Sequence, residues 1–90
     1  MPKAEVEIVN KLGLHARAAS KLVGLAGNYQ ATFTIGHPGK AAVNGKSIMS
    51  VLMLAASKGT PLVIHCDGVD EQELADAVCA LVANCFDEGE

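Results

Sequence analysis

Apolar and polar residues alternate along this chain over 5–9, 31–35 and 61–66. Alternation of this kind is typical of strands with one buried and one solvent-facing side. In the first stretch Val6 and Ile8 share one side, and the two intervening glutamates share the other. We therefore predict three strands, whose inward-facing residues are Val6, Ile8, Phe33, Ile35, Leu62, Ile64 and Cys66.

A turn signal, Gly36-His37-Pro38-Gly39, separates the second of these strands from a short apolar stretch over 41–43. Glycine and proline in such clusters favour turns. The pattern predicts a hairpin with a short fourth strand. Asn44-Gly45 then makes the next turn.

From Ala16 the spacing becomes helical, with Ala19, Leu22, Val23 and Ala26 on one face. Gly27-Asn28 predicts a left-handed stop to this helix. A last helix is expected after Asp70, which resembles a capping pair with Glu73. Its predicted buried stripe is Leu74, Val78, Leu81, Val82, Cys85 and Phe86, and the acidic end over 87–90 is expected to fray in solvent.

Between these two helices, Ser47 can cap a short helix that begins at Ile48. This segment is apolar on more than one side, so one face cannot bury all of it. We expect Ile48, Met49 and Leu52 to be exposed, although in a small domain they could also belong to the core.

The predicted order is βαββαβα with short connections. Right-handed crossovers then give an α+β open-faced sandwich, in which three helices cover one face of a four-stranded, largely antiparallel sheet. No linker or repeat interrupts the 90 residues, so we expect a single domain over 1–90.

The charge and the lengths of the apolar stretches bear on the class of binding partner and on the cellular location of the protein. Seven Lys and Arg against ten Asp and Glu, a formal net charge of −3, argue against binding nucleic acid. The longest apolar stretch, 48–56, is far shorter than the roughly 20 residues that span a bilayer. No secretory signal is visible near Met1, so a cytoplasmic protein without membrane insertion is expected.

Three cysteines, Cys66, Cys79 and Cys85, form neither a CxxC pair nor a metal-ligand pattern. We expect buried free thiols and no metal. His37 and His65 belong to no motif, and packing or surface roles are expected for them.

The string GLHARAAS, residues 13–20, places His15 and Arg17 on the opening turn of the first helix. The first helical amides, those of Ala16, Arg17 and Ala18, lack partners within the helix, and the helix dipole adds positive charge. An anion on His15 would be stabilised there and by the Arg17 guanidinium. We predict that His15 takes up and passes on an anionic group.

The same string resembles the active-site signature of the HPr family, the histidine-containing phosphocarriers of the bacterial phosphoenolpyruvate-dependent phosphotransferase system. Residues 45–51, GKSIMSV, are similar to the regulatory-serine region of that family. The resemblance spans nearly the whole chain. It departs from the commonest signature at Ala18, where proline is usual, and this leaves open which amides bind the phosphoryl group.

The resemblance implies the same open-faced sandwich and a carrier rather than an enzyme, with no cofactor. His15 would accept a phosphoryl group on Nδ1 from phosphorylated enzyme I and donate it to an EIIA-type acceptor domain, in sugar uptake or in the nitrogen-related branch. The surface recognised by these partners would include Ser20, Ile48, Met49 and Leu52. A monomer is expected.

Ser47 has two interpretations. It can be a plain helix cap, or it can be a regulatory site phosphorylated by an HPr kinase/phosphorylase, as the resemblance implies. An HPr-like regulatory module that acts through Ser47 without carrying phosphate is the first alternative function. A ferredoxin-like domain that binds a small molecule or a metal is the second.

Overall fold

The computed structural model of the chain describes residues 2–87, and these form the βαββαβα order that the sequence predicts. A short 3-10 turn, η1, follows the last helix. The strands are β1 (Lys3–Glu7), β2 (Thr32–Gly36), β3 (Val43–Asn44) and β4 (Pro61–Asp67); the helices are α1 (Ala16–Ala26), α2 (Ile48–Leu52) and α3 (Glu71–Ala83), and η1 covers Cys85–Asp87.

The strands form one antiparallel sheet in the order β1-β4-β2-β3. The first strand lies at 3–7 rather than at the predicted 5–9, and β3 is only Val43–Asn44 rather than 41–43. In the register, Lys3 and Thr34 flank His65 from the two neighbouring strands. β4 therefore lies in the middle of the sheet.

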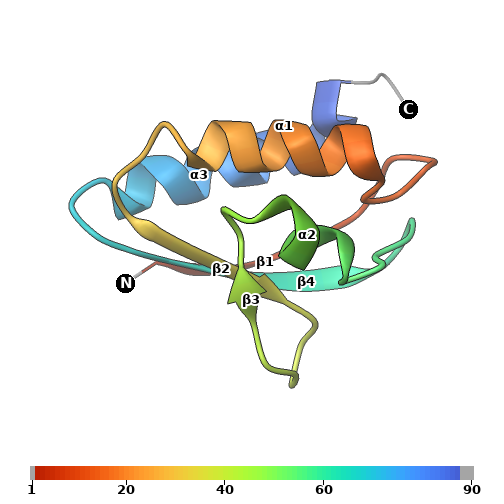
Figure 1. Cartoon of the computed structure of the whole chain (residues 1–90), viewed down its shortest axis with the longest axis horizontal. Helices are drawn as coiled ribbons and strands as arrows, with labels where there is room; N and C mark the ends of the chain where they lie inside the picture. Colours follow the sequence, from red (N-terminus) through yellow and green to blue (C-terminus); the bar gives the residue numbers. More distant parts are fainter. Residues whose placement is uncertain (1, 88–90) are drawn as a thin grey trace.

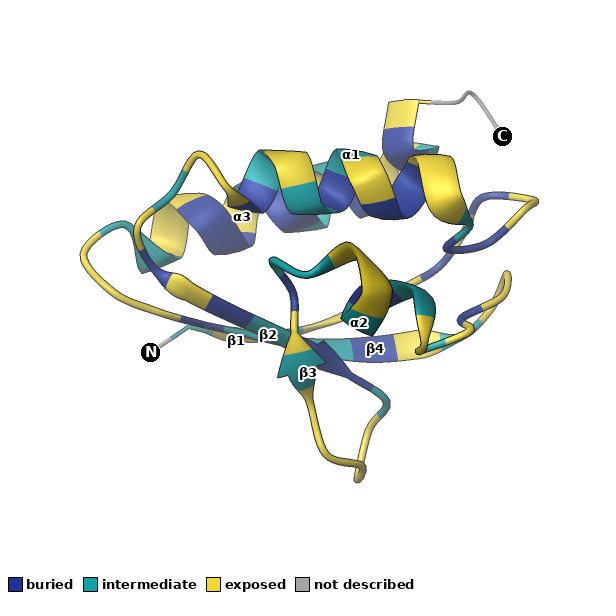
Figure 2. Cartoon of the chain, viewed as in Figure 1, coloured by how far each residue is buried: buried dark blue, intermediate teal, exposed yellow. Residues whose placement is uncertain are grey.

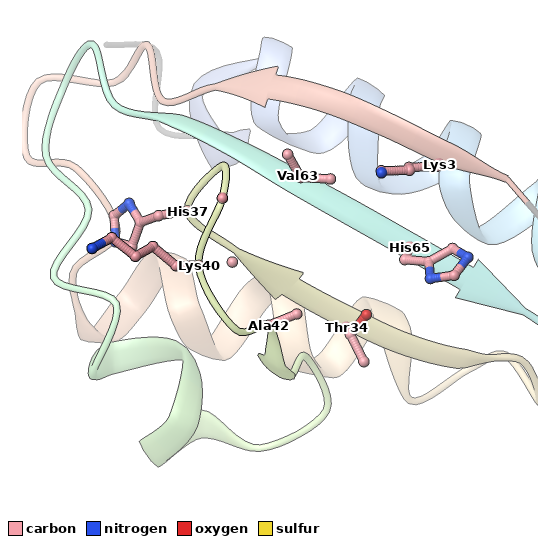
Figure 3. Close-up of a pocket in the computed structure, with 9 residues that line it drawn as sticks. Lys3, Thr34, His37, Lys40, Ala42, Val63 and His65 are labelled. Atoms are coloured by element: carbon pink, nitrogen blue, oxygen red, sulfur yellow. The ribbon is translucent and has the colours of Figure 1, made fainter.

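All three helices of the described chain lie on the same side of this sheet, as predicted (Figure 1). Figure 2 shows that buried residues of α1 and α3 face the sheet. The other face carries no helix, and Thr34, Val63 and His65 project from it (Figure 3). The molecule is thus an open-faced sandwich.

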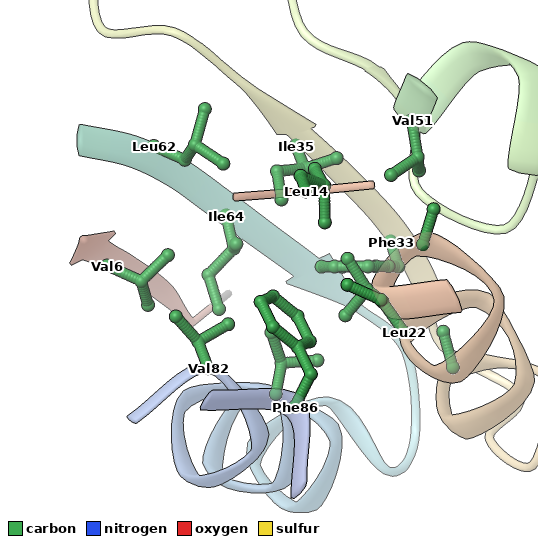
Figure 4. Packing of buried hydrophobic residues seen from close by; sticks show 14 of the residues in the cluster. Val6, Leu14, Leu22, Phe33, Ile35, Val51, Leu62, Ile64, Val82 and Phe86 are labelled. Carbon is green, nitrogen blue, oxygen red and sulfur yellow. The ribbon is translucent and has the colours of Figure 1, made fainter. Parts of the chain in front are cut away.

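The core lies between the sheet and the helices (Figure 4). The predicted alternation is confirmed, because the inward-facing strand residues are buried, while the residues between them are exposed or half-buried. On α1 the buried residues are Ala18, Ala19, Leu22 and Ala26, and Val23 is half-buried against them. The small alanine side chains let α1 pack closely against α2 and α3.

The predicted left-handed stop of α1 is wrong. Gly27 has φ −64°, an ordinary right-handed helical value, and Asn28 does not have a positive φ. The helix instead tightens into a turn, in which the amides of Asn28 and Tyr29 donate to the carbonyls of Leu25 and Ala26 at 3.1 Å each.

The predicted capping pair at Asp70 is also wrong. Asp70 occupies the N-cap position of α3, but its side chain makes no capping hydrogen bond. Its carboxylate oxygens accept the amides of Gln30 (2.9 Å) and Ala31 (2.8 Å) in the connection between α1 and β2. These bonds, that of Gln30 above all, lower the pKa of Asp70. The side chain therefore fastens two distant segments together.

The buried stripe of α3 continues beyond the helix by a different geometry from the one predicted. The helix ends at Ala83, and Cys85, Phe86 and Asp87 all have left-handed φ values of 56°, 55° and 63°. Phe86 is fully buried, as expected, but this turn places it in the core, whereas Cys85 is half-buried. The Phe86 carbonyl accepts a hydrogen bond from the Lys21 ammonium at 2.8 Å. The expected frayed end beyond Asp87 lies outside the described residues.

Candidate functional site

His15 is the residue that begins α1. Its backbone is extended (φ −79°, ψ 178°), and its carbonyl accepts the first helical bond, from Ala19, at 2.8 Å. Its ring nitrogen Nδ1 accepts the Arg17 amide at 3.2 Å. A nitrogen that accepts a hydrogen bond carries a lone pair and no proton, so the lone pair of Nδ1 faces the helix start. The ring is partly exposed, and another protein can therefore reach it.

The loop before His15 is fixed by its backbone. Gly13 has φ +69°, and a Cβ there would lie 2.6 Å from the Ala56 carbonyl oxygen. That oxygen accepts the Leu14 amide at 2.8 Å, while the buried Asn10 side chain donates to the Gly13 carbonyl at 2.7 Å. Because the Leu14 side chain is also buried, His15 extends from an anchored point.

The start of α1 is electropositive. The amides of Ala16, Arg17 and Ala18 precede the first helical bond and have no acceptor one turn back. No acidic residue lies in the first turn, and Arg17 is exposed. The helix dipole and the guanidinium therefore both favour an anion beside His15.

Packing explains two of the small side chains at the start of α1. Ala18 and Ala19 are fully buried and face the core. Only Ala16 and Arg17 of the opening turn, with Ser20 beyond it, are exposed.

Ser47 caps α2, as predicted: its Oγ accepts the Ser50 amide at 3.3 Å. The turn before it is tight. A Cβ on Gly45 would overlap the buried Phe33 ring, and the Asn44 side chain accepts the Lys46 amide at 2.9 Å. The serine as a whole is half-buried.

An apolar surface surrounds α2, but its members differ from those predicted. Ile48 and Met49 are 42% and 69% exposed, as expected. Leu52 is half-buried against the core, and Met53, at the C-cap, is 79% exposed in its place. We call Ile48, Met49 and Met53 the α2 patch. The exposure of Met53 was not predicted, because the sequence does not show where so short a helix ends or in which direction the next side chain points.

The remaining chemistry is sparse. Within residues 2–87 no group of three or more His, Cys, Asp or Glu side chains could hold a metal ion. Cys66 is buried, as expected, and burial raises the pKa of its thiol; Cys79 and Cys85 are only half-buried. His37 donates from Nε2 to the Leu54 carbonyl at 2.8 Å, a packing role. His65 lies on the open face of the sheet.

No helix in the described part of the chain is long and apolar enough to cross a membrane.

Comparison with known proteins agrees with this geometry. A family model described as "PTS HPr component phosphorylation site" matches residues 2–84. The phosphocarrier protein HPr of Pseudomonas aeruginosa is 53% identical over 90 residues, all of both chains, and the phosphocarrier protein NPr of Proteus mirabilis is 39% identical over 83 residues, 92% of each. Among solved structures, HPr from Thermoanaerobacter tengcongensis has a TM-score of 0.92 at 35% identity and covers 98% of each chain.

Proposed function

The chain belongs to the HPr family of phosphocarrier proteins, and from this we propose that His15 is the residue that carries the phosphoryl group. As a member of this family the protein is a carrier of the phosphotransferase system and not a catalytic enzyme. Its partners are those of the system, enzyme I and acceptor domains. The observation that carries the proposal for His15 is the Nδ1 lone pair, which faces the amide of Arg17 at the helix start.

The transfer requires one bond to form and one to break. The Nδ1 lone pair of His15 attacks phosphorus, a P–N bond forms, and the bond between phosphorus and the donor group of phosphorylated enzyme I breaks with its electron pair returning to the donor. Positioning and charge stabilisation dominate such transfers. In the second transfer a nucleophile of the acceptor domain attacks phosphorus and forms the new bond, and the P–N bond breaks with its electron pair returning to Nδ1 of His15.

The surrounding groups stabilise the charge of the bound phosphoryl group. The Arg17 amide must leave Nδ1 when the P–N bond forms, and its N–H is then placed to donate to a phosphoryl oxygen. We propose the amides of Ala16 and Ala18 as further donors and the Arg17 guanidinium as the counter-charge. The alanine at position 18 retains an N–H that the family's usual proline lacks.

The α2 patch, with Ser20 and the half-buried Leu52, is proposed as the docking surface for enzyme I and the acceptors. α1 and α2 pack against each other, and the Leu14–Ala56 hydrogen bond joins the segments that lead into one and out of the other. One partner could therefore contact the apolar residues and His15 together.

We propose that Ser47 is also a site of regulation by a kinase. Phosphorylation would add about −1.5 to −2 charges beside Ile48 and Met49, and an apolar partner surface would dock less well there. Regulation without phosphoryl transfer is not favoured by the comparisons. We further propose that residues 1–90 act as one monomeric, cytoplasmic domain, which light scattering and cell fractionation would test.

The experiment for His15 is labelling by phosphoenolpyruvate and enzyme I. The wild-type protein should gain an acid-labile, base-stable phosphoryl group, and His15→Ala should keep its fold and gain none. His65→Ala is the matched control and should label normally. Label that survives in His15→Ala would refute the assignment.

The choice between the sugar and the nitrogen branch follows from the acceptor. Labelled protein should be offered in parallel to a sugar-specific and a nitrogen-related acceptor domain, since relatives of this chain include proteins named HPr and NPr. The acceptor that removes the label faster identifies the branch.

A further inference from the structure

The open face of the sheet contains a groove that the phosphocarrier function does not use. It encloses about 250 Å³, and its polar lining includes Lys3, Thr34, His37, Lys40 and His65. The volume is close to the lower end of the range for small-molecule sites. The helices cover the opposite face of the sheet, so the groove does not include the start of α1. Its His37 end contacts the Leu54 carbonyl, next to Met53 of the α2 patch.

The pairing of the strands places Lys3, His65 and Thr34 next to one another at one end of the groove. Lys3 pairs with His65, and His65 pairs with Thr34, so three polar side chains from β1, β4 and β2 form a row across the sheet. Directly paired residues have Cβ atoms about 5 Å apart. Their neighbours along the strands face the core, which fixes this row on the open side.

The loop between β2 and β3 forms the other end. Gly36 permits a close approach, because a Cβ there would lie 2.9 Å from the Ala42 Cα. The Lys40 amide donates to the His37 carbonyl at 3.0 Å, and the His37 ring is held by its bond to the Leu54 carbonyl. Lys40 and His37 therefore lie side by side, as Figure 3 shows.

Figure 3 also shows where the lining side chains lie along the groove. His37 and Lys40 lie at one end, Lys3 and His65 at the other, and Val63 lies between them. A ligand that matched this arrangement would have an acidic group at each end of a short carbon skeleton.

The charges around the groove favour an anion. In a chain with a formal net charge of −3, the described residues that line the groove include two lysines and no carboxylate. The nearest acidic side chains on this face by strand alternation are Glu5, two residues after Lys3, and Asp67, two residues after His65. Glu71 also interacts electrostatically with His65. These carboxylates lie outside the groove lining and would repel an anion, so the preference for an anion comes from Lys3 and Lys40, which line the groove.

We propose that this groove binds a small dianion with two separated acidic groups, either a dicarboxylate or a molecule with one carboxylate and one phosphate. The Lys3 ammonium, the His65 ring and the Thr34 hydroxyl bind one acidic group, Lys40 binds the other, and Val63 contacts the carbon chain between them. Because the site is on the uncovered face, the ligand would not cover the start of α1.

The test is a titration followed by amide NMR shifts, with succinate as the dicarboxylate, 3-phosphoglycerate as the carboxylate with phosphate, and acetate at equal ionic strength as the single-ended control. Saturable shifts at Thr34, Lys40 and His65 with either dianion, and much weaker shifts with acetate, would support the proposal. The stronger of the two dianions identifies the chemistry.

Variants separate this site from general electrostatic attraction. Lys3→Gln and Lys40→Gln should each weaken binding about threefold, and together about tenfold, as expected for exposed charge pairs that act independently. Lys58→Gln removes the same charge outside the groove and should have no effect. Shifts confined to Arg17 and Ala18, equal shifts with acetate, or equal weakening by Lys58→Gln would each overturn the proposal.

Discussion

Replacing Gly13 by alanine should loosen the loop that presents His15. Gly13 has a left-handed φ of +69°, and an added Cβ would lie 2.6 Å from the Ala56 carbonyl oxygen. That oxygen is the acceptor for Leu14, so the methyl group and the hydrogen bond compete for the same space. Gly39 is a matched control, because its φ is +76° but nothing lies within 4 Å of its Cβ position.

Both substitutions place an alanine in a left-handed conformation, but only Gly13→Ala also creates a steric clash. A left-handed alanine costs about 1–2 kcal/mol, and this applies at both Gly13 and Gly39. Displacing the Ala56 carbonyl adds about 1–2 kcal/mol at Gly13 alone, for a strained or lost hydrogen bond. We therefore expect the free energy of unfolding to fall by about 2–4 kcal/mol in Gly13→Ala and by about 1–2 kcal/mol in Gly39→Ala.

Urea unfolding measures the stability of both variants, and labelling by enzyme I measures the presentation of His15. Misplacement of a reacting group by about 1 Å can reduce a rate up to a hundredfold, so we expect Gly13→Ala to be labelled at least about tenfold more slowly under conditions where it is folded. Gly39→Ala should be labelled at the wild-type rate. Equal stability losses in the two variants, or normal labelling of Gly13→Ala, would refute the reasoning.

Three other predictions address α1, Asp70 and the α2 patch. Gly24→Ala should raise the free energy of unfolding by about 0.5–1 kcal/mol in urea, because Gly24 is helical and nothing lies near its Cβ position; a loss of stability would contradict this. The lowered pKa of Asp70 means that its carboxylate stabilises the folded state above about pH 4 and that this contribution is lost as the pH falls through the lower folded-state value. Asp70→Asn should therefore be less stable at pH 7 and lose less stability on acidification, and an unchanged pH profile of thermal unfolding would argue against it. Met49→Glu should slow phosphoryl transfer from enzyme I about tenfold, whereas Val69→Glu, at an apolar residue 85% exposed elsewhere, should not; equal effects would remove the α2 patch as the docking surface.

The sequence predicted the parts of the fold that depend on periodicity. Alternation identified the inward-facing residues of β1, β2 and β4, and helical spacing identified most of the buried face of α1. Both periods follow directly from backbone geometry, so they can be read without tertiary information.

The errors occurred where tertiary contacts decide the outcome. Asp70 stands where a capping residue is expected, but its carboxylate instead binds two amides about forty positions earlier in the chain, a distance that no local pattern reports. Phe86 was correctly assigned to the core for the wrong reason, since three left-handed residues rather than a continued helix place it there. The exposure of Met53 was not predicted. At the end of α2 it is Met53 that is exposed, whereas Leu52, which the sequence predicted to be exposed, packs against the core.

The sequence predicted the position of His15 but not the contacts that hold it there. His15 at the start of a helix followed from the order of residues 13–20, and the structure has it there. The hydrogen bond from Leu14 to Ala56, which fixes the loop, joins residues that only the folded chain brings together. The groove on the open face could not be predicted, because it depends on the register that aligns Lys3, His65 and Thr34.

The position of β4 has a consequence for how the protein is made. β4 is the last strand to be synthesised, yet it lies between β1 and β2, which emerge from the ribosome much earlier. Until Asp67 has left the exit tunnel, neither of those strands has its central partner, and the nascent chain must hold two unpaired edges. A pause in translation before residue 61 would therefore extend the time during which this chain is exposed to chaperones and proteases.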